Sequence, residues 1–120
     1  MGIKLFDSEW KVMDVLWRRG TDTPAREVAR ELEGLVGWNK NTTYTVLKKC
    51  VEKGAVERRE PNFLCRALVP REEVQRQAAE ELVDKVFDGS ASLLFASLLS
   101  GKSLSPEEVQ RLRALVDELS

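Results

Sequence analysis

The chain of 120 residues has no histidine and only two cysteines. The absence of histidine excludes a metal site built on imidazole, and two cysteines alone make a poor cage for a metal ion. The sequence also has no glycine-rich phosphate loop, no nucleophile elbow and no recognisable catalytic pair. We therefore predict a protein that is not an enzyme and that has no catalytic residue, no metal site and no cofactor.

Long apolar runs are missing as well. No stretch approaches the roughly 20 apolar residues that span a bilayer, and the N-terminal MGIKLFDSEW lacks the apolar core of a secretory signal. These features predict a cytoplasmic protein without membrane insertion. In such a protein we expect Cys50 and Cys65 to be small buried hydrophobes, with a redox or metal role as the alternative.

The chain as a whole has no large excess of charge, because its net charge is −1. The distribution is nevertheless uneven: residues 1–69 hold 13 Lys and Arg against 10 Asp and Glu, whereas residues 70–120 hold 6 against 10. Between Lys40 and Arg66 the counts are 7 and 3. A modest basic patch of this kind favours selective, salt-sensitive binding to phosphate over a general coating of nucleic acid.

The basic patch begins with a predicted helix, residues 41–53, that has two different faces. One face is a stripe predicted to point to the core: Thr43, Val46, Leu47, Cys50 and Val51. The other carries polar side chains: Asn41, Thr42, Thr45, Lys48, Lys49 and Glu52, with Tyr44 on the flank. Threonines allow close approach to base edges, and lysines neutralise phosphate, so this second face is predicted to contact DNA.

Two predicted strands follow this helix. Gly54 supplies the left-handed residue that ends the helix, and residues 55–59 and 63–69 are typical of strands around Glu60-Pro61-Asn62. The cations of this hairpin are Arg58, Arg59 and Arg66. A basic helix followed by a basic hairpin is how a winged helix-turn-helix contacts duplex DNA. Ordinary solvated charges on a small α+β domain are the alternative.

The N-terminal segment predicts two further helices. The first opens at Asp7 or Ser8 and carries an apolar stripe bordered by Val12, with Val15 well off it: Phe6, Trp10, Met13, Leu16 and Trp17. The second begins with Thr23 as its N-cap and Pro24 at its first helical position. Trp38 is expected to pack before the basic helix. An extra strand at residues 3–5 would fit the winged-helix order.

From Pro70 onward the sequence predicts three helices, at residues 71–88, 90–100 and from Ser105 to the C-terminus. The middle helix is apolar nearly all round and must be enclosed on more than one side. Because three short helices bury too little apolar surface alone, we expect a second copy of the chain to cover them. Folding back onto the winged domain, or a different partner, is the alternative. The predicted dimerisation residues are Leu82, Val86, Leu93, Leu94, Leu98, Leu112, Leu115, Val116 and Leu119.

These patterns predict a mainly α (α+β) chain with two domains. Residues 1–69 are a winged helix-turn-helix DNA-binding domain, and residues 70–120 are a three-helix dimerisation domain. The expected function is sequence-specific transcriptional repression by a homodimer on double-stranded operator DNA with dyad symmetry, because two recognition helices one helical turn apart match such a site. A winged-helix module that binds proteins and not DNA is the competing function.

Three segments carry a resemblance to a known family: LFDSEWKVMDVLW, NKNTTYTVLKKCVEKGAVERRE, and the tail from DGSASLLF to LSPEEVQRLRALVDEL. They resemble the penicillinase-repressor family, the BlaI/MecI/CopY group of bacterial regulators, from about Leu5 to Leu119. The resemblance implies a dimeric winged-helix repressor on a palindromic operator of resistance or metal-homeostasis genes. It also implies these DNA-facing residues: Lys40, Thr42, Thr45, Lys48 and Lys49 in the helix, with Arg58, Arg59 and Arg66 in the wing.

The chain departs from the family it resembles in two ways. The copper-responsive branch carries paired C-terminal cysteines, and no cysteine follows Cys65 here, which argues against copper sensing by that route. In the antibiotic-responsive branch, a membrane metalloprotease sensor triggers cutting of an Asn-Phe bond in the helix after a glycine like Gly89. Counting without gaps places the equivalent cleavage at Ser97-Leu98, where neither residue type matches. The resemblance therefore implies such a sensor as a partner, but the releasing signal is unassigned.

Overall fold

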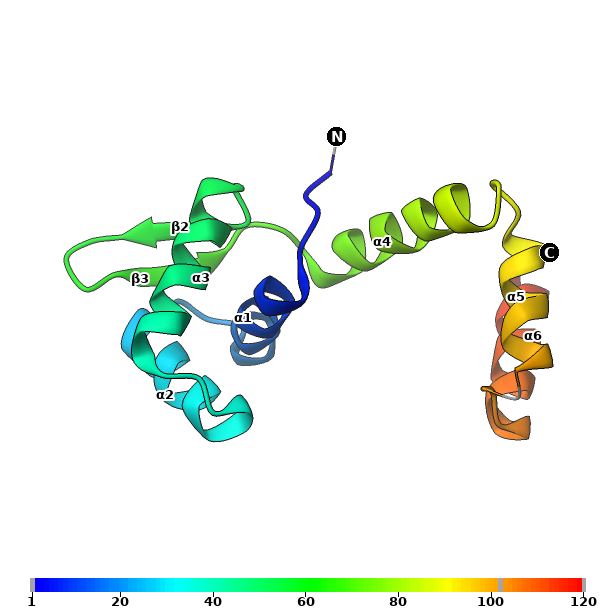
Figure 1. Cartoon of the computed structure of the whole chain (residues 1–120), viewed down its shortest axis with the longest axis horizontal. Coiled ribbons are helices and arrows are strands. Elements are labelled where there is room, and N and C mark those ends of the chain that lie inside the picture. The colour runs from blue at the N-terminus through cyan, green and yellow to red at the C-terminus, as the bar shows by residue number, and fades with distance from the viewer. Residues whose placement is uncertain (1, 102, 120) are drawn as a thin grey trace. The chain divides into compact units, whose positions relative to one another are not determined.

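The computed structural model describes residues 2–101 and 103–119, without the side chain of Leu119. It forms two compact units, residues 1–78 and 79–120, and the helix α4 (Arg71–Val86) begins in the first and ends in the second (Figure 1). The rest of the first unit is, in chain order, α1 (Asp7–Arg19), β1 (Thr23–Pro24), α2 (Ala25–Val36), α3 (Lys40–Glu52), β2 (Val56–Arg59) and β3 (Leu64–Ala67). The predicted helices and the predicted hairpin are thus confirmed.

The three strands form one antiparallel sheet in the order β1-β3-β2. The strand β1 corrects two predictions, since Thr23 and Pro24 pair with β3 where a helix start was expected, and residues 3–5 form no strand. The helix α2 therefore begins at Ala25, whose N–H donates to the carbonyl oxygen of Phe63 at 2.9 Å. Pairing with a distant strand has overridden the local preference of Thr-Pro for a helix N-terminus.

The helix α1 also begins differently from the prediction. Phe6, and neither Asp7 nor Ser8, takes the N-cap position, and its side chain is 59% exposed instead of joining the apolar stripe. The Glu9 carboxylate accepts a hydrogen bond from the Phe6 N–H at 2.7 Å, which satisfies one donor at the helix start. Val15, predicted to lie off the stripe, is fully buried because α1 contacts α2, α3 and β3 at once.

The core of the first unit lies where these elements meet. Met13 of α1, Leu32 of α2, Leu47 of α3 and Val56 of β2 are all essentially inaccessible to solvent. Trp38, in the connection before α3, is half-buried against this core, as predicted from the sequence. Each helix of the unit therefore has one face fixed by burial, which determines what its other face presents to solvent.

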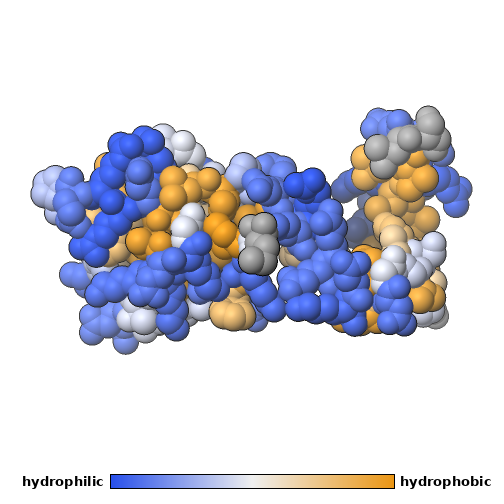
Figure 2. Space-filling model, turned by 90° about the horizontal axis from the view of Figure 1, so that it is seen from above, coloured by the Kyte–Doolittle hydropathy of each residue, from blue (hydrophilic) through white to orange (hydrophobic). Residues whose placement is uncertain are grey.

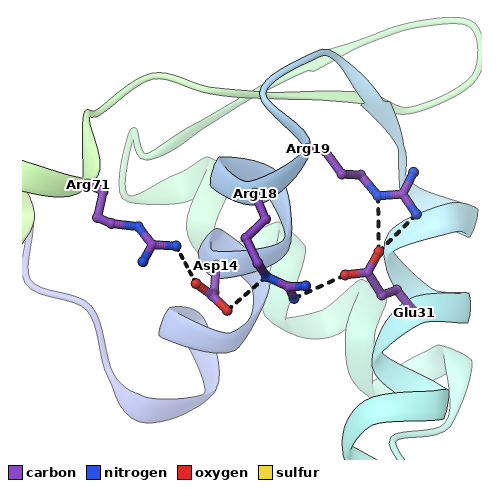
Figure 3. A network of polar contacts seen from close by, with 5 residues as sticks. All are labelled: Asp14, Arg18, Arg19, Glu31 and Arg71. Carbon is purple, nitrogen blue, oxygen red and sulfur yellow. Dashed lines mark hydrogen bonds and ion pairs between the residues drawn. The ribbon is translucent and has the colours of Figure 1, made fainter.

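A network of ion pairs joins α1, α2 and the first turn of α4 (Figure 3). Asp14 accepts hydrogen bonds from Arg18, at 3.2 Å, and from Arg71. Glu31 of α2 accepts from Arg19 at 2.9 Å and pairs with Arg18 at 3.0 Å. These arginines already have acidic partners, so their charges are largely neutralised within the unit.

The second unit contains the end of α4, α5 (Ala91–Ser100) and α6 (Pro106–Leu119). Ser90 and Ser105 cap the last two helices, since their hydroxyl oxygens accept the N–H groups of Leu93 and Glu108 at 3.2 Å. No residue of α5 is buried, although this helix is apolar on most sides. Figure 2 shows apolar residues, in orange, at the surface of this unit. Among the described residues, no helix is both long and apolar enough to cross a membrane.

Candidate nucleic-acid interface

The helix α3 separates its two faces by burial. Thr43, Val46, Leu47 and Cys50 are buried, and Val51 is half-buried. The polar residues on the other side reach the solvent: Lys40, Asn41, Thr45, Lys48, Lys49 and Glu52 are exposed, while Thr42 and Tyr44 are partly exposed. The exposed face of α3 thus consists of small polar and cationic side chains.

The start of α3 is held by its own polar side chains. The Asn39 side-chain oxygen accepts the Thr42 N–H at 2.9 Å and the Thr42 hydroxyl at 3.1 Å. The Thr45 hydroxyl donates to the carbonyl oxygen of Asn41 at 2.9 Å. Both hydroxyl hydrogens are therefore used within the helix, and each threonine has an acceptor oxygen and a methyl group left for an approaching base.

The three lysines of this face carry uncompensated charge. Lys40, Lys48 and Lys49 have no carboxylate within ion-pairing distance in the part of the chain that the structure describes. The Lys40 ammonium lies 5.7 Å from the centre of the Tyr44 ring, a cation–π contact that leaves its charge intact. Such lysines are free to neutralise phosphate and release its counterions.

The C-terminal end of α3 is anchored by a charge pair that was not predicted from the sequence. The Lys53 ammonium lies 2.5 Å from a carboxylate oxygen of Glu9, which is only 1% exposed, and donates to the carbonyl oxygen of Lys4 at 2.8 Å. It also lies 4.1 Å from the centre of the Phe6 ring. This pair fixes the end of α3 to the start of α1.

The three hairpin arginines lie on two different faces of the sheet. Arg58 is paired with the buried Cys65, whereas Arg66 is paired with Glu57 and Arg59 with Leu64. Cross-strand partners share a face and neighbours along a strand alternate. Arg58 therefore lies on the core side of the sheet, and Arg59 and Arg66 lie on the opposite side.

Arg59 and Arg66 are held by acidic side chains. Arg66 makes two hydrogen bonds to the Asp22 carboxylate, at 2.9 and 3.2 Å. The hydrogen bond from Arg66 lowers the pKa of Asp22, and the same bond raises the pKa of Arg66. Arg59 donates to Glu57 at 2.9 Å and lies 3.8 Å from Asp22. Each of these two cations already has an anionic partner.

Arg58 also has an acidic partner, Glu60, but its guanidinium is in addition placed next to α3 by aromatic rings. Its guanidinium lies 3.8 Å from the centre of the Phe63 ring, and its Nε donates to Glu60. The Phe63 ring meets the Tyr44 ring edge to face, with centres 5.8 Å apart at 61°. The structure thus brings Lys40, Tyr44 and Arg58 together through Phe63, a residue for which the sequence indicated only an apolar strand position.

The two cysteines are buried, and burial raises the pKa of Cys50 to about 12 and that of Cys65 to about 11. The reactive thiolate is therefore scarce at neutral pH. We expect a chromogenic disulfide reagent at pH 8 to react with the native chain at least about a hundredfold more slowly than with the same chain in urea. Equal rates in the two states would contradict this burial and favour a redox role.

The arrangement of the first unit defines its class. Three helices, the third with an exposed polar and cationic face, are followed by a β-hairpin that completes a three-stranded sheet, which is a winged helix-turn-helix domain. No group of side chains in the described ranges, residues 2–101 and 103–119, is arranged to hold a metal ion.

The sequence matches the profile of the penicillinase repressor family over residues 5–118, and the chain belongs to this family. It is 22% identical over 117 residues to the methicillin resistance regulatory protein MecI of Staphylococcus aureus (strain N315), covering 96% of this chain and 94% of that protein. It is also 22% identical to the penicillinase repressor of Bacillus licheniformis, covering 96% and 91%. These relatives are named as regulators and not as enzymes.

The fold has a solved counterpart as well. The chain is similar to the solution structure of the DNA-binding domain of the repressor BlaI, with a TM-score of 0.53 and 25% sequence identity. The match covers 57% of this chain and 85% of that domain. Both the family resemblance and the winged-helix fold predicted from the sequence are confirmed.

Proposed function

We propose that this chain is a DNA-binding transcriptional repressor that contacts duplex DNA with the outer face of α3 and with the β2–β3 hairpin. The observation that carries the proposal is the orientation of α3, whose aliphatic stripe is buried and whose threonines and lysines reach solvent. Membership of the penicillinase repressor family and similarity to the DNA-binding domain of BlaI support it. The proposed contacts on α3 are Lys40, Asn41, Thr42, Tyr44, Thr45, Lys48 and Lys49, and those on the hairpin are one or more of the predicted cations Arg58, Arg59 and Arg66.

The competing function, a winged helix that binds another protein, would require different residue types on the outer face of α3. A protein-binding helix would expose apolar side chains at the centre of its outer face. Asn41, Thr45 and Lys49 occupy that position here, and all three are exposed. The chemistry of this face therefore favours nucleic acid.

We further propose that the chain acts as a homodimer through residues 70–120. The support is the apolar surface of the second unit, because contiguous exposed apolar residues mark interaction sites. Leu82, Val86, Leu93, Leu115 and Val116 are exposed, and Leu94, Leu98 and Leu112 are half-buried, while the side chain of Leu119 lies outside the described residues. A dimer of this kind combines the affinities of two winged domains for a dyad-symmetric operator.

The kind of genes that this chain regulates is proposed by analogy with the relatives. MecI is named for methicillin resistance and its relative for penicillinase, so we propose a resistance or stress-type operon, bound in the cytoplasm. Release by proteolysis in α5, triggered by a membrane metalloprotease sensor, is one candidate route. The Ser97-Leu98 bond lies within this helix, where the Ser97 carbonyl oxygen accepts the Gly101 N–H at 3.1 Å. Cutting there would require the helix to open locally.

The interface is tested by removing one lysine. Lys49→Ala should lower the slope of log affinity against log salt concentration by about 0.9 per protomer, because one phosphate contact is lost. The measurement is fluorescence anisotropy of the full chain with a duplex selected from a random library. Lys11→Ala, which removes an exposed lysine of α1, is the matched control and should leave the slope unchanged.

Thr45→Ala tests base contact on the same face. This variant should keep the salt slope but discriminate less between the selected duplex and a random one, by roughly tenfold for one base contact. If Lys49→Ala and Thr45→Ala both bound every duplex as the parent does, the outer face of α3 would not be the DNA-binding surface.

A further inference from the structure

The three hairpin arginines differ in what their terminal nitrogens contact. Arg66 donates one hydrogen bond to Asp22 from its Nε and a second from a terminal nitrogen. A terminal nitrogen of Arg59 also lies near Asp22. Arg58 donates to Glu60 from its Nε, and among residues 2–101 and 103–119 its terminal nitrogens donate no hydrogen bond to a carboxylate. Among the described residues, Arg58 therefore keeps both terminal nitrogens for a phosphate, whereas one terminal nitrogen of Arg66 is bonded to Asp22 and one of Arg59 lies near it.

The surroundings of Arg58 also restrict where its guanidinium can point. Its guanidinium carbon lies over the Phe63 ring, 3.8 Å from the ring centre, and its Nε donates to Glu60 in the turn of the hairpin. An arginine held by stacking and by one hydrogen bond loses less side-chain entropy when it binds. The guanidinium is thus oriented before any ligand arrives.

Phe63 connects this arginine to α3. The ring is buried and meets the Tyr44 ring edge to face at 5.8 Å, and Lys40 lies over Tyr44 at 5.7 Å. The carbonyl oxygen of Phe63 accepts the Ala25 N–H at the start of α2. Phe63 therefore fixes the hairpin turn to α2 through its backbone and to α3 through its side chain.

We infer that Arg58 is the one hairpin cation that binds phosphate together with α3, and that Phe63 is the positioning residue that holds it there. This inference rests on the proposed DNA-binding function. It assigns different roles to three hairpin arginines that the sequence alone does not distinguish. Arg59 and Arg66, on the other face of the sheet and paired with Asp22 and Glu57, stabilise the hairpin and contribute little to binding.

The test compares Arg58→Ala, Arg59→Ala and Arg66→Ala in the full chain, with a labelled duplex of about 30 base pairs, roughly three helical turns, selected for binding to the parent. Arg58→Ala should weaken binding about tenfold, as for one charge-assisted hydrogen bond, and lower the salt slope by about 0.9 per protomer. The other two variants are the matched controls and should keep the parent slope. A slope lowered by Arg59→Ala or Arg66→Ala but not by Arg58→Ala would overturn the inference.

A double-mutant cycle tests the role of Phe63. Phe63→Leu keeps an apolar side chain but removes the ring, so it should weaken binding in the parent and add nothing in the Arg58→Ala background. In the Lys49→Ala background its effect should be fully additive. Additive losses with Arg58→Ala would show that Phe63 does not act through Arg58, and would contradict the positioning role.

Binding by Arg58→Lys and binding by the parent chain separate a failure of this inference from a failure to fold and from a failure of the proposed function. If Phe63→Leu lacks a cooperative thermal transition, Arg58→Lys replaces it, because lysine keeps the charge and loses the planar stack. Parent-like binding by Arg58→Lys would contradict the role of stacking. A parent chain that bound no duplex at any salt concentration would refute the proposed function itself, whereas a parent that binds alongside an unaffected Arg58→Ala would refute only this inference.

Discussion

Replacement of Leu115 by aspartate is expected to convert the proposed dimer into monomers and to weaken binding to a dyad-symmetric duplex about a hundredfold or more. Leu115 lies on α6 and is 51% exposed in the single chain. A carboxylate at this position costs little in a monomer because it remains hydrated. Buried against a second copy, the same unpaired charge would cost several kcal/mol. Sedimentation at micromolar concentration measures the change in mass.

The choice of position makes this test specific to assembly. Leu94 and Leu112 are half-buried within the unit, so aspartate at either position would disturb folding and assembly together. Gln110→Asp introduces the same charge at an exposed polar position of α6 and should sediment as the parent does. A parent that is itself monomeric, or a Leu115→Asp variant that remains dimeric, would remove the basis for the two-fold operator.

Replacement of Lys53 by methionine is expected to destabilise the first unit by about 3–5 kcal/mol. The change leaves the Glu9 carboxylate buried, at 1% exposure. Among the described residues, the Phe6 N–H is then the hydrogen-bond donor that remains to it. A loss of this size is a large part of the 5–15 kcal/mol that is typical of folded domains. Urea unfolding followed by circular dichroism should show a midpoint lowered by roughly 2 M.

Two variants separate the buried charge from other effects of losing a lysine. Lys49→Met removes an exposed lysine from the same helix and should change stability by less than about 0.5 kcal/mol. The double variant Glu9→Gln, Lys53→Met removes the unpaired buried charge of Glu9 and should recover most of the lost stability. If Lys53→Met were as stable as Lys49→Met, the Glu9–Lys53 pair would not hold α3 in place.

The helices could be predicted from the sequence because their apolar residues recur at helical spacing. The inward stripe of α3, with Val46, Leu47 and Cys50, follows from that period alone. Helical spacing does not identify every buried residue where a helix is covered on more than one side. Val15 is buried because α1 meets α2, α3 and the sheet together, and the number of neighbours around a helix is a property of the fold.

Features that join distant residues could not be predicted. Thr23 and Pro24 have the local pattern of a helix N-terminus, and only the presence of β3 makes them a strand. Glu9 looks like an ordinary acid in the first turn of a helix, and its partner Lys53 is 44 residues away. Neither the strand nor the buried pair has a local signal that distinguishes it from the alternatives.

The division among the hairpin arginines also depends on the fold. A shift of one residue in strand register moves every side chain to the other face of the sheet. The sequence does not define the register of a four-residue strand closely enough to separate Arg58 from Arg59. The observed pairing of Arg58 with Cys65 does so, and it places one predicted cation beside α3 and two on the other face of the sheet.

Binding of DNA by α3 can be observed residue by residue when the isotope-labelled full chain is titrated with a selected duplex and its backbone amide chemical shifts are recorded. We expect the largest shift changes on the exposed face of α3, at Asn41, Thr45 and Lys49, and at the hairpin turn near Arg58. Changes confined to α2 or to the second unit, with α3 unaffected at saturation, would contradict DNA binding by α3.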